Sequence, residues 1–376
     1  MRSKRPYPAP PGGKALGAAV EGVSASRIAG VGALTTDPRR RSPDASPRTL
    51  GASCETRHPM ARILLTSRLP DDALGPIVGH ELVMSSSGVP LTADEVADLA
   101  RDVDAIVCQL TDRITEAVLA RASRLAVVAT VSVGYDNLDV EAATRAGVAV
   151  CNTPGVLDDT TADLAFALIL AASRLLSESE ADLRKGGWTD WRFDGYLGQD
   201  VHGATLGLVG YGRIGRAVAR RAEGFSMRVL HNARRPTGLQ GCVIELDDLL
   251  RQADVVSLHV PLTPETRHLI DARRLALMKP TAVLVNTARG PVVDEEALGA
   301  ALESGRLFAA GLDVYEHEPT VHPRLLAAPR TVLLPHIGSA SFATRTAMAR
   351  LATSAVAEVL AGGRPPNTVN PEVFGN

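Results

Sequence analysis

The sequence has few cysteines, almost no net charge and no long apolar run, and each absence argues against a class of protein. Its four cysteines, Cys54, Cys108, Cys151 and Cys242, show neither a C-x-x-C pair nor the spacing of a metal site. We therefore expect reduced thiols and no bound metal. Lys and Arg number 40 and Asp and Glu 42, and this net charge of −2 indicates no nucleic acid or acidic membrane partner. No apolar run approaches the roughly 20 residues that cross a bilayer, so we expect a cytoplasmic globular protein.

The first 59 residues differ in composition from the remainder. They are rich in Pro, Gly, Ser, Ala and Arg, with ten Lys or Arg against four Asp or Glu. Such a segment buries too little apolar surface to order itself. It is a disordered tail, an Arg-rich targeting peptide or translated sequence upstream of the true start. Met60 stands directly before the first apolar run, which favours the last interpretation, and we predict that residues 1–59 lie outside the fold.

Apolar runs alternate with amphipathic segments from Met60 onward, which predicts repeated βα units and parallel sheets. The predicted strands are 63–66, 105–109, 126–130 and 149–151 in a first series, and 205–209, 228–231, 255–259, 282–286, 309–312 and 332–334 in a second. Helical patterns include 93–101, 141–146, 161–174 and 342–360. We predict an α/β protein of two doubly wound parallel-sheet domains. A Rossmann cofactor domain (159–338) is inserted in a flavodoxin-like substrate domain (60–158 and 339–376).

A glycine-rich turn directly follows the predicted strand 205–209. Gly210, Gly212 and Gly215 have the G-x-G-x-x-G spacing, and a helical run follows them. In a dinucleotide site these glycines serve a tight turn, a close approach of the backbone to the pyrophosphate, and close packing of helix on strand. The helix N-terminus offers unpaired N–H groups to the phosphates. The motif predicts a dinucleotide site; the alternative is a structural βα turn.

The segment after the next strand is basic. A unit that prefers NAD carries an acidic residue there for the ribose 2′-hydroxyl, but no Asp or Glu occurs between Glu223 and Glu245. Asn232, Arg234 and Arg235 stand there instead, and guanidinium groups bind phosphate through paired hydrogen bonds. The pattern predicts a preference for NADP(H), with NAD(H) as the second cofactor. The alternative is a solvated basic loop.

Three residues that suit acid–base chemistry follow three later strands. Arg289, Glu318 and His336 each come after a predicted strand of the second series, at the sheet edge where such folds bind ligands. Arg can hold a carboxylate through two parallel hydrogen bonds, and His can exchange a proton near neutral pH. Each residue alone has an ordinary structural explanation. Together, beside a dinucleotide turn, they predict a catalytic site.

Several motifs in this order resemble the D-isomer-specific 2-hydroxyacid dehydrogenases, over residues 63–374. They are V-S-V-G-Y-D-N-L-D (131–139), V-A-V-C-N-T-P-G (148–155), D-T-T-A-D (159–163), V-P-L-T (260–263), and the segments 286–294, 311–319 and 335–339. Within the family the chain is most similar to the glyoxylate/hydroxypyruvate reductases, including the 2-ketogluconate reductase type. The stretch 230–236 resembles the NADP(H) loop of that subgroup.

The resemblance implies a role for each matching residue. Arg289 would bind the 2-oxo acid carboxylate, with main-chain N–H groups near Val133 and Gly134. His336 would donate the proton to the carbonyl oxygen, and Glu318 would hold His336 protonated and oriented. The residues implied along the cofactor are Arg213, Ile214, Val260, Pro261, Thr287, Ala288, Asp313, His336 and Gly338. The substrate would be glyoxylate, hydroxypyruvate or 2-ketogluconate, and the protein a homodimer.

Two other functions remain open at this stage. An NAD-linked dehydrogenase of another substrate, of the phosphoglycerate or phosphite type, is one; the missing acidic residue argues against it. A cofactor-sensing binding protein like the corepressors that share this fold is the other, and turnover would distinguish it. An aromatic loop with Trp188, Trp191, Phe193 and Tyr196 either shapes a neighbouring subunit's site or anchors the dimer interface.

Overall fold

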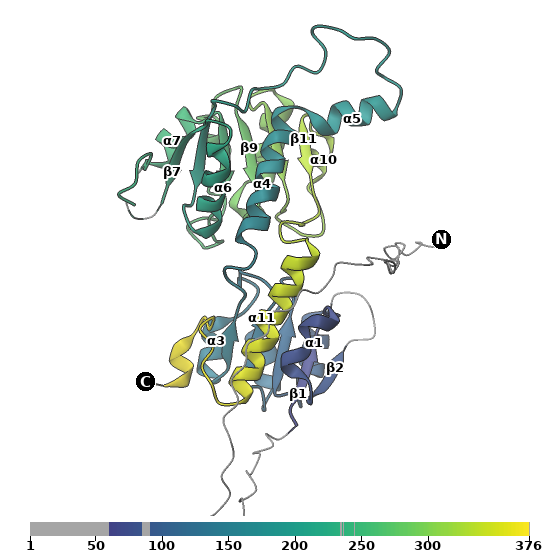
Figure 1. The fold of residues 1–376 in the computed structure, drawn as a ribbon, viewed down its shortest axis with the longest axis vertical. Helices are drawn as coiled ribbons and strands as arrows, with labels where there is room; N and C mark the ends of the chain where they lie inside the picture. Colours follow the sequence, from purple (N-terminus) through teal and green to yellow (C-terminus); the bar gives the residue numbers. More distant parts are fainter. Residues whose placement is uncertain (1–59, 85–90, 234, 236, 244, 376) are drawn as a thin grey trace, which may run out of the picture. The chain divides into compact units, whose positions relative to one another are not determined.

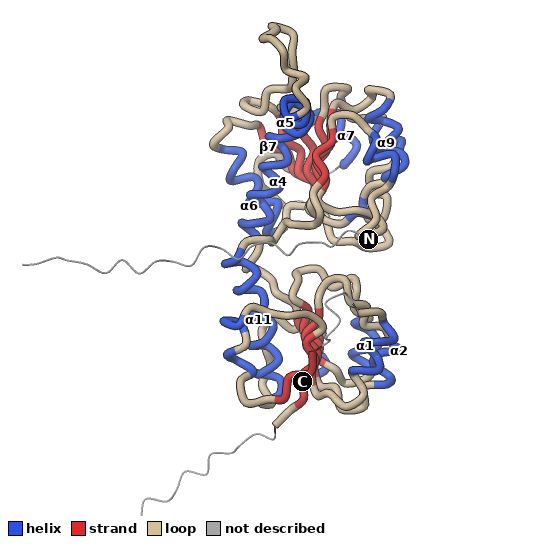
Figure 2. Tube along the Cα trace, turned by 90° about the vertical axis from the view of Figure 1, so that its right-hand side faces the viewer, coloured by secondary structure: helices blue, strands red, loops and turns tan. Residues whose placement is uncertain are grey.

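The computed structural model describes residues 60–84, 91–233, 235, 237–243 and 245–375. The predicted extension 1–59 and Arg234 lie outside these described residues. Residues 60–375 contain two parallel sheets (Figures 1 and 2). The α/β fold class predicted from the alternation of apolar and amphipathic segments is confirmed.

The first sheet has five strands in the order β2-β1-β3-β4-β5. Its strands are β1 (Arg62–Leu65), β2 (Glu81–Met84), β3 (Ala105–Cys108), β4 (Val127–Thr130) and β5 (Ala149–Cys151). The order reverses between β1 and β3, and the edge at such a switch point is where doubly wound sheets bind ligands. The loops that follow β1 and β3 therefore meet at a natural binding crevice.

Both faces of the first sheet are buried, and the two-residue period of the strands divides their side chains between the faces. In β1, Leu64 belongs to one apolar cluster, while Ile63 and Leu65 belong to another. The first cluster includes side chains of α1 (Ala93–Leu99), α2 (Glu116–Arg121) and α3 (Val140–Arg145). The second includes side chains of α11 (Phe342–Leu360), so a late segment of the chain packs on the first sheet (Figure 2).

The second sheet has six strands in the order β11-β10-β9-β8-β6-β7. They are β6 (Thr205–Val209), β7 (Arg228–Asn232), β8 (Val255–Leu258), β9 (Val283–Asn286), β10 (Ala309–Leu312) and β11 (Thr331–Leu333). The order reverses between β6 and β8. This switch point brings the glycine turn after β6 next to the residues that follow β8.

Helices cover both faces of the second sheet as well. One apolar cluster joins it to α4 (Asp158–Ser173) and α6 (Arg213–Glu223). The other joins it to α7 (Leu246–Gln252), α8 (Ala272–Leu275), α9 (Glu295–Glu303) and α10 (Pro323–Ala327). The helix α5 (Leu176–Arg184) extends from α4. No single described helix is long and apolar enough to cross a membrane; α4 and α5, bent by 64°, pass that test only as a pair.

The structure corrects several predicted boundaries. The edge strand β2 is absent from the prediction because its run of three apolar residues, Leu82, Val83 and Met84, is too short to show the period of a strand; its side chains are mostly exposed. The glycine-turn helix begins at Arg213, since Gly212 is its N-cap, and so starts within the glycine motif rather than after it. The last strand is Thr331–Leu333 instead of 332–334, and β8 and β9 are each one residue shorter than predicted, whereas β10 has the predicted bounds 309–312. Hydrogen bonding ends each strand where the partner strand ends, which apolar content alone does not reveal.

Candidate active site

The three glycines of the turn after β6 have three different surroundings. Gly210 has a φ of +95°, and a Cβ there would lie 2.5 Å from the His259 carbonyl oxygen. A Cβ on Gly215 would overlap the Gly210 carbonyl oxygen. A Cβ on Gly212, the N-cap of α6, would meet nothing within 4 Å. The fold therefore requires the first and third glycines, whereas the second leaves open space at the helix N-terminus, where a pyrophosphate fits.

A second feature, at the end of β9 on the same edge of the sheet, suits a dinucleotide. The Thr287 hydroxyl is buried and has no hydrogen-bond partner among the described residues. A buried hydroxyl without a partner is costly, and a polar group of a bound cofactor would satisfy it. Its neighbour Ala288 donates its N–H to Asn286 Oδ1 at 3.0 Å.

The remaining residues predicted to contact the cofactor lie on the loops around the glycine turn. Val260 and Pro261 follow β8, at the switch point. Ile214 packs against apolar clusters of both sheets, and Arg213 begins α6. Of the basic loop, Asn232 ends β7 and donates to the Val243 carbonyl at 3.0 Å, and Arg235 is exposed.

His336 and Glu318 form the pair that the strand ends predicted. His336 Nδ1 lies 2.8 Å from Glu318 Oε2, and the two side chains are each 26% exposed. The second carboxylate oxygen, Oε1, accepts the Tyr315 N–H at 3.0 Å. Burial alone would raise the pKa of Glu318, but its hydrogen bond to His336 and the nearby charges lower it below its usual value. The carboxylate is thus ionised, and the other ring nitrogen of His336, Nε2, is free of this bond.

Asp313 holds the loop that carries His336. Its two carboxylate oxygens accept the main-chain N–H groups of Ile337 and Gly338, each at 2.7 Å. His336 itself has a φ of +53°, an unusual conformation for a residue other than glycine. Burial raises the pKa of Asp313. The resemblance implied that Asp313 and Gly338 contact the cofactor, and the structure adds this positioning contact between them.

Arg289 is held at the other side of the site. Its Nε donates to Asp136 Oδ1 at 2.9 Å and its Nη1 to the Ala288 carbonyl at 2.9 Å. Gly134 lies so close to the guanidinium that a Cβ there would overlap Nη2. The structure thus brings Arg289 to the loop that the resemblance implied for the substrate carboxylate. The main-chain N–H groups of Val133 and Gly134 have no partner among the described residues.

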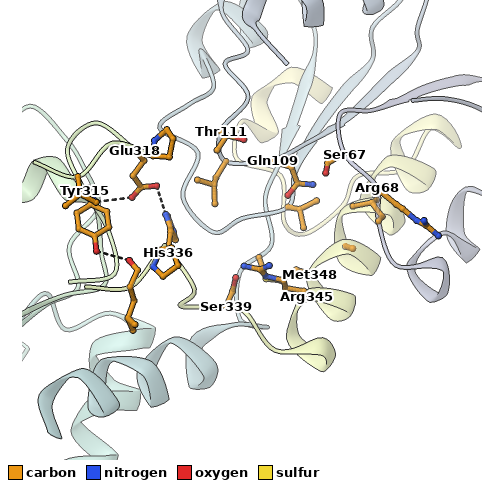
Figure 3. Close-up of a pocket in the computed structure, with 18 of the residues that line it drawn as sticks. Ser67, Arg68, Gln109, Thr111, Tyr315, Glu318, His336, Ser339, Arg345 and Met348 are labelled. Carbon is orange, nitrogen blue, oxygen red and sulfur yellow. Dashed lines mark hydrogen bonds and ion pairs between the residues drawn. The ribbon is translucent and has the colours of Figure 1, made fainter. Parts of the chain in front are cut away.

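A cavity of about 990 Å³ opens beside His336 and Glu318 (Figure 3). Most of its wall is apolar, with Leu69, Leu110 and Met348 among the side chains. Arg289, Val133 and Gly134 are not among its lining residues. The structure therefore places the His–Glu pair at the cavity and the arginine outside it.

Two residues that support the site were missed by the sequence reasoning. Asp136 lies within a motif that was quoted only for its resemblance, and nothing local indicates its arginine partner. Asn286 at the end of β9 bonds both ends of the Arg289 loop, through the Ala288 N–H and the Arg289 carbonyl. Its position at the end of a predicted strand could have identified Asn286 as a residue near the site. No cluster of three or more His, Cys, Asp or Glu in the described ranges could hold a metal ion.

Comparisons with known proteins agree with this geometry. Residues 166–338 match the family model of the D-isomer specific 2-hydroxyacid dehydrogenase, NAD binding domain. The chain is 45% identical over 323 residues to a glyoxylate reductase of Thermococcus onnurineus, covering 83% of this chain and 97% of that protein.

Solved structures are similar over the same length. A protein of Thermus thermophilus has a TM-score of 0.78 and 46% identity, covering 82% of this chain and 99% of its own. An NADPH-dependent glyoxylate/hydroxypyruvate reductase of Sinorhizobium meliloti, solved in complex with NADP and malonate, has a TM-score of 0.75 and 34% identity, covering 84% and 98%.

Proposed function

The chain belongs to the D-isomer-specific 2-hydroxyacid dehydrogenase family and is an oxidoreductase that uses a nicotinamide cofactor, and from this premise we propose that it reduces small 2-oxo acids to D-2-hydroxy acids with NADPH. The substrates are glyoxylate, hydroxypyruvate and 2-ketogluconate. The observation that carries the proposal is the 2.8 Å pair of His336 and Glu318, which lines a large cavity. The names of the similar reductases support the choice of substrate.

In the proposed reaction, His336 is the proton donor. Its Nδ1–H is bonded to the ionised Glu318, so the proton that reaches the substrate carbonyl oxygen leaves from Nε2. Glu318 stabilises the imidazolium before this transfer and keeps the ring oriented afterwards. When bound, the reduced nicotinamide supplies the hydride that adds to the carbonyl carbon. Glu318 takes no proton in this step, and its lowered pKa in the pair with His336 agrees with a carboxylate before the transfer.

Arg289 binds the substrate carboxylate. Its Nε and one hydrogen of Nη1 are occupied by Asp136 and the Ala288 carbonyl, and Nη2 faces Gly134. The guanidinium therefore keeps donors for a carboxylate on the side where the Val133 and Gly134 N–H groups are unpartnered. The resulting field also polarises the carbonyl next to that carboxylate.

The cofactor preference rests on the loop after β7. Asn232 and the exposed Arg235 lie where an acidic residue would bind a ribose 2′-hydroxyl. A 2′-phosphate there gains charged hydrogen bonds worth roughly 1.5–3 kcal/mol each, about ten- to hundredfold in affinity. Together with Arg234, these side chains favour NADPH over NADH.

The exposed aromatic side chains after α5 support a homodimer. Trp191 is 76% and Phe193 87% exposed, which is unusual for large apolar groups and typical of a surface that another chain covers. Light scattering of the purified protein gives the oligomeric state directly. A dimer that the substitution Trp191→Ser converts to a monomer supports this assignment, and a wild-type monomer contradicts it.

The decisive assay follows oxidation of NADPH and NADH with glyoxylate, hydroxypyruvate and 2-ketogluconate. We expect turnover mainly with NADPH. His336→Ala should lower kcat about 10²–10⁴-fold with NADPH affinity unchanged, whereas His202→Ala, at an exposed position before β6, is the matched control. Arg235→Gln should weaken NADPH more than NADH.

Each part of the proposal can fail separately. Wild-type turnover in the His336 variant would exclude it as the proton donor. Equal losses for NADPH and NADH in the Arg235 variant would remove the 2′-phosphate assignment but leave the chemistry. No turnover with any pairing of cofactor and substrate would favour a sensing protein over an enzyme.

A further inference from the structure

The cavity beside His336 lies at the switch point of the first sheet. Ser67 and Arg68 follow β1, and Gln109 and Thr111 follow β3; all four line the cavity. The order of the sheet reverses between these two strands, and the crevice there is the ordinary ligand site of a doubly wound sheet. The cavity is thus a binding crevice of the first sheet that reaches His336.

The cavity is much larger than the smallest proposed substrate needs. Its volume of about 990 Å³ is at the upper end of the roughly 300–1,000 Å³ that hold drug-sized ligands, whereas glyoxylate has only two carbons and its carbonyl carbon carries only a hydrogen besides the carboxylate. Arg289 and Gly134, which bind the carboxylate in the proposed reaction, do not line it. A substrate whose carboxylate binds Arg289 and whose carbonyl oxygen faces His336 would extend any longer substituent into this cavity.

The charged side chains of the cavity that lie outside the His336–Glu318 pair are all positive. Apart from the paired His336 and Glu318, the charged side chains among its described lining residues are Arg68 and Arg345. Within the described part of the chain, neither guanidinium has an ion-pair or hydrogen-bond partner. In the view of Figure 3, Arg345 lies beside Ser339 and between His336 and Arg68.

We propose that this cavity is a subsite for the far end of the substrate and selects 2-oxo acids that carry a second anionic group. This inference rests on the proposed function. Arg345, near the start of α11, binds the distal anion, and Arg68 adds positive charge farther along the crevice. Leu69, Leu110 and Met348 contact the methylene groups between the two ends. A charged hydrogen bond to an otherwise unpaired guanidinium is the strongest polar contact that this cavity offers.

The test compares two substrates of equal length that differ only at the far end. 2-Oxoadipate ends in a carboxylate and 2-oxohexanoate ends in a methyl group. We expect kcat/KM of the wild type to favour 2-oxoadipate by roughly ten- to hundredfold. Arg345→Gln should reduce this ratio at least tenfold, and Arg345→Lys should retain part of it because the charge remains. Arg350→Gln is the matched control, since Arg350 is exposed on the same helix but does not line the cavity.

The outcomes separate this inference from the proposed function. Wild-type turnover of glyoxylate together with a 2-oxoadipate to 2-oxohexanoate ratio near one would overturn the distal site alone. A ratio that Arg345→Gln leaves unchanged, or that Arg350→Gln lowers equally, would also overturn it. Faster reduction of 2-ketogluconate than of 2-oxoadipate would assign the cavity to hydroxyl groups instead. Absence of glyoxylate and hydroxypyruvate turnover would count against the proposed function itself.

Discussion

Replacing Gly212 by serine should separate cofactor binding from folding. A Cβ on Gly212 would meet no atom of the described chain within 4 Å, and the φ of −78° suits any residue. Serine is also a favoured N-cap residue for α6. We therefore expect the free energy of unfolding to stay within about 0.5 kcal/mol of wild type, as for other substitutions at sites without contacts.

The same substitution should damage cofactor affinity. The hydroxymethyl group of Ser would occupy the space next to the α6 N-terminus, where the pyrophosphate approaches the backbone. Losing one charged hydrogen bond from a main-chain N–H group corresponds to about ten- to hundredfold in Kd for NADPH. Fluorescence titration of the protein with NADPH measures this Kd, and thermal unfolding without cofactor measures stability.

Gly215→Ala is the contrasting variant. Its methyl group would overlap the Gly210 carbonyl oxygen, so the backbone of the turn must shift. Overpacking of this kind costs roughly 1–3 kcal/mol, which lowers Tm by several degrees before any cofactor is added. The reasoning is refuted if Gly212→Ser binds NADPH like the wild type, or if it unfolds as early as Gly215→Ala.

Two further predictions concern ionisable groups. Glu318→Gln removes the charged partner of His336 and should lower kcat about tenfold or more while NADPH affinity stays normal; an unchanged kcat would show that the pair is not used. Burial lowers the pKa of His259 to about 4 from 6.5, so the unfolded chain takes up a proton in that interval that the folded chain does not. The free energy of unfolding should therefore fall as the pH drops from 6.5 to about 4, by at most about 3 kcal/mol. In His259→Asn, urea unfolding at several pH values should show a smaller fall; an equal fall would assign the effect to other groups.

Local chemistry made much of the fold predictable. The glycine spacing after β6 specifies a backbone conformation within six residues, and the structure confirms the strand before the turn and the helix after it. The predicted helix 342–360 has the bounds that the structure gives α11. Boundaries set by partner strands, as at β11, were less accurate because hydrogen bonding between distant segments decides them.

The candidate site was predictable only in part. Arg289, Glu318 and His336 were identified because each follows a strand of one parallel sheet, and the carboxyl ends of parallel strands share an edge. The pairing of His336 with Glu318 follows from that edge, since only one strand and a short helix separate them in the chain. The pairing of Arg289 with Asp136 does not, because 153 positions separate them and they belong to loops of different sheets.

By itself, the sequence determined the βα repeat, the glycine turn and the residue types at the strand ends, because each depends on neighbours within a few residues. The tertiary structure alone decided which loops meet. It pairs Arg289 with Asp136, and it brings the Asp313 carboxylate to the main-chain N–H groups of the loop that carries His336. It also packs α11 against the first sheet. The cavity between the ends of β1 and β3 also depends on strand order. Strand order is set by packing of the whole chain. An apolar pattern that repeats from strand to strand does not predict it.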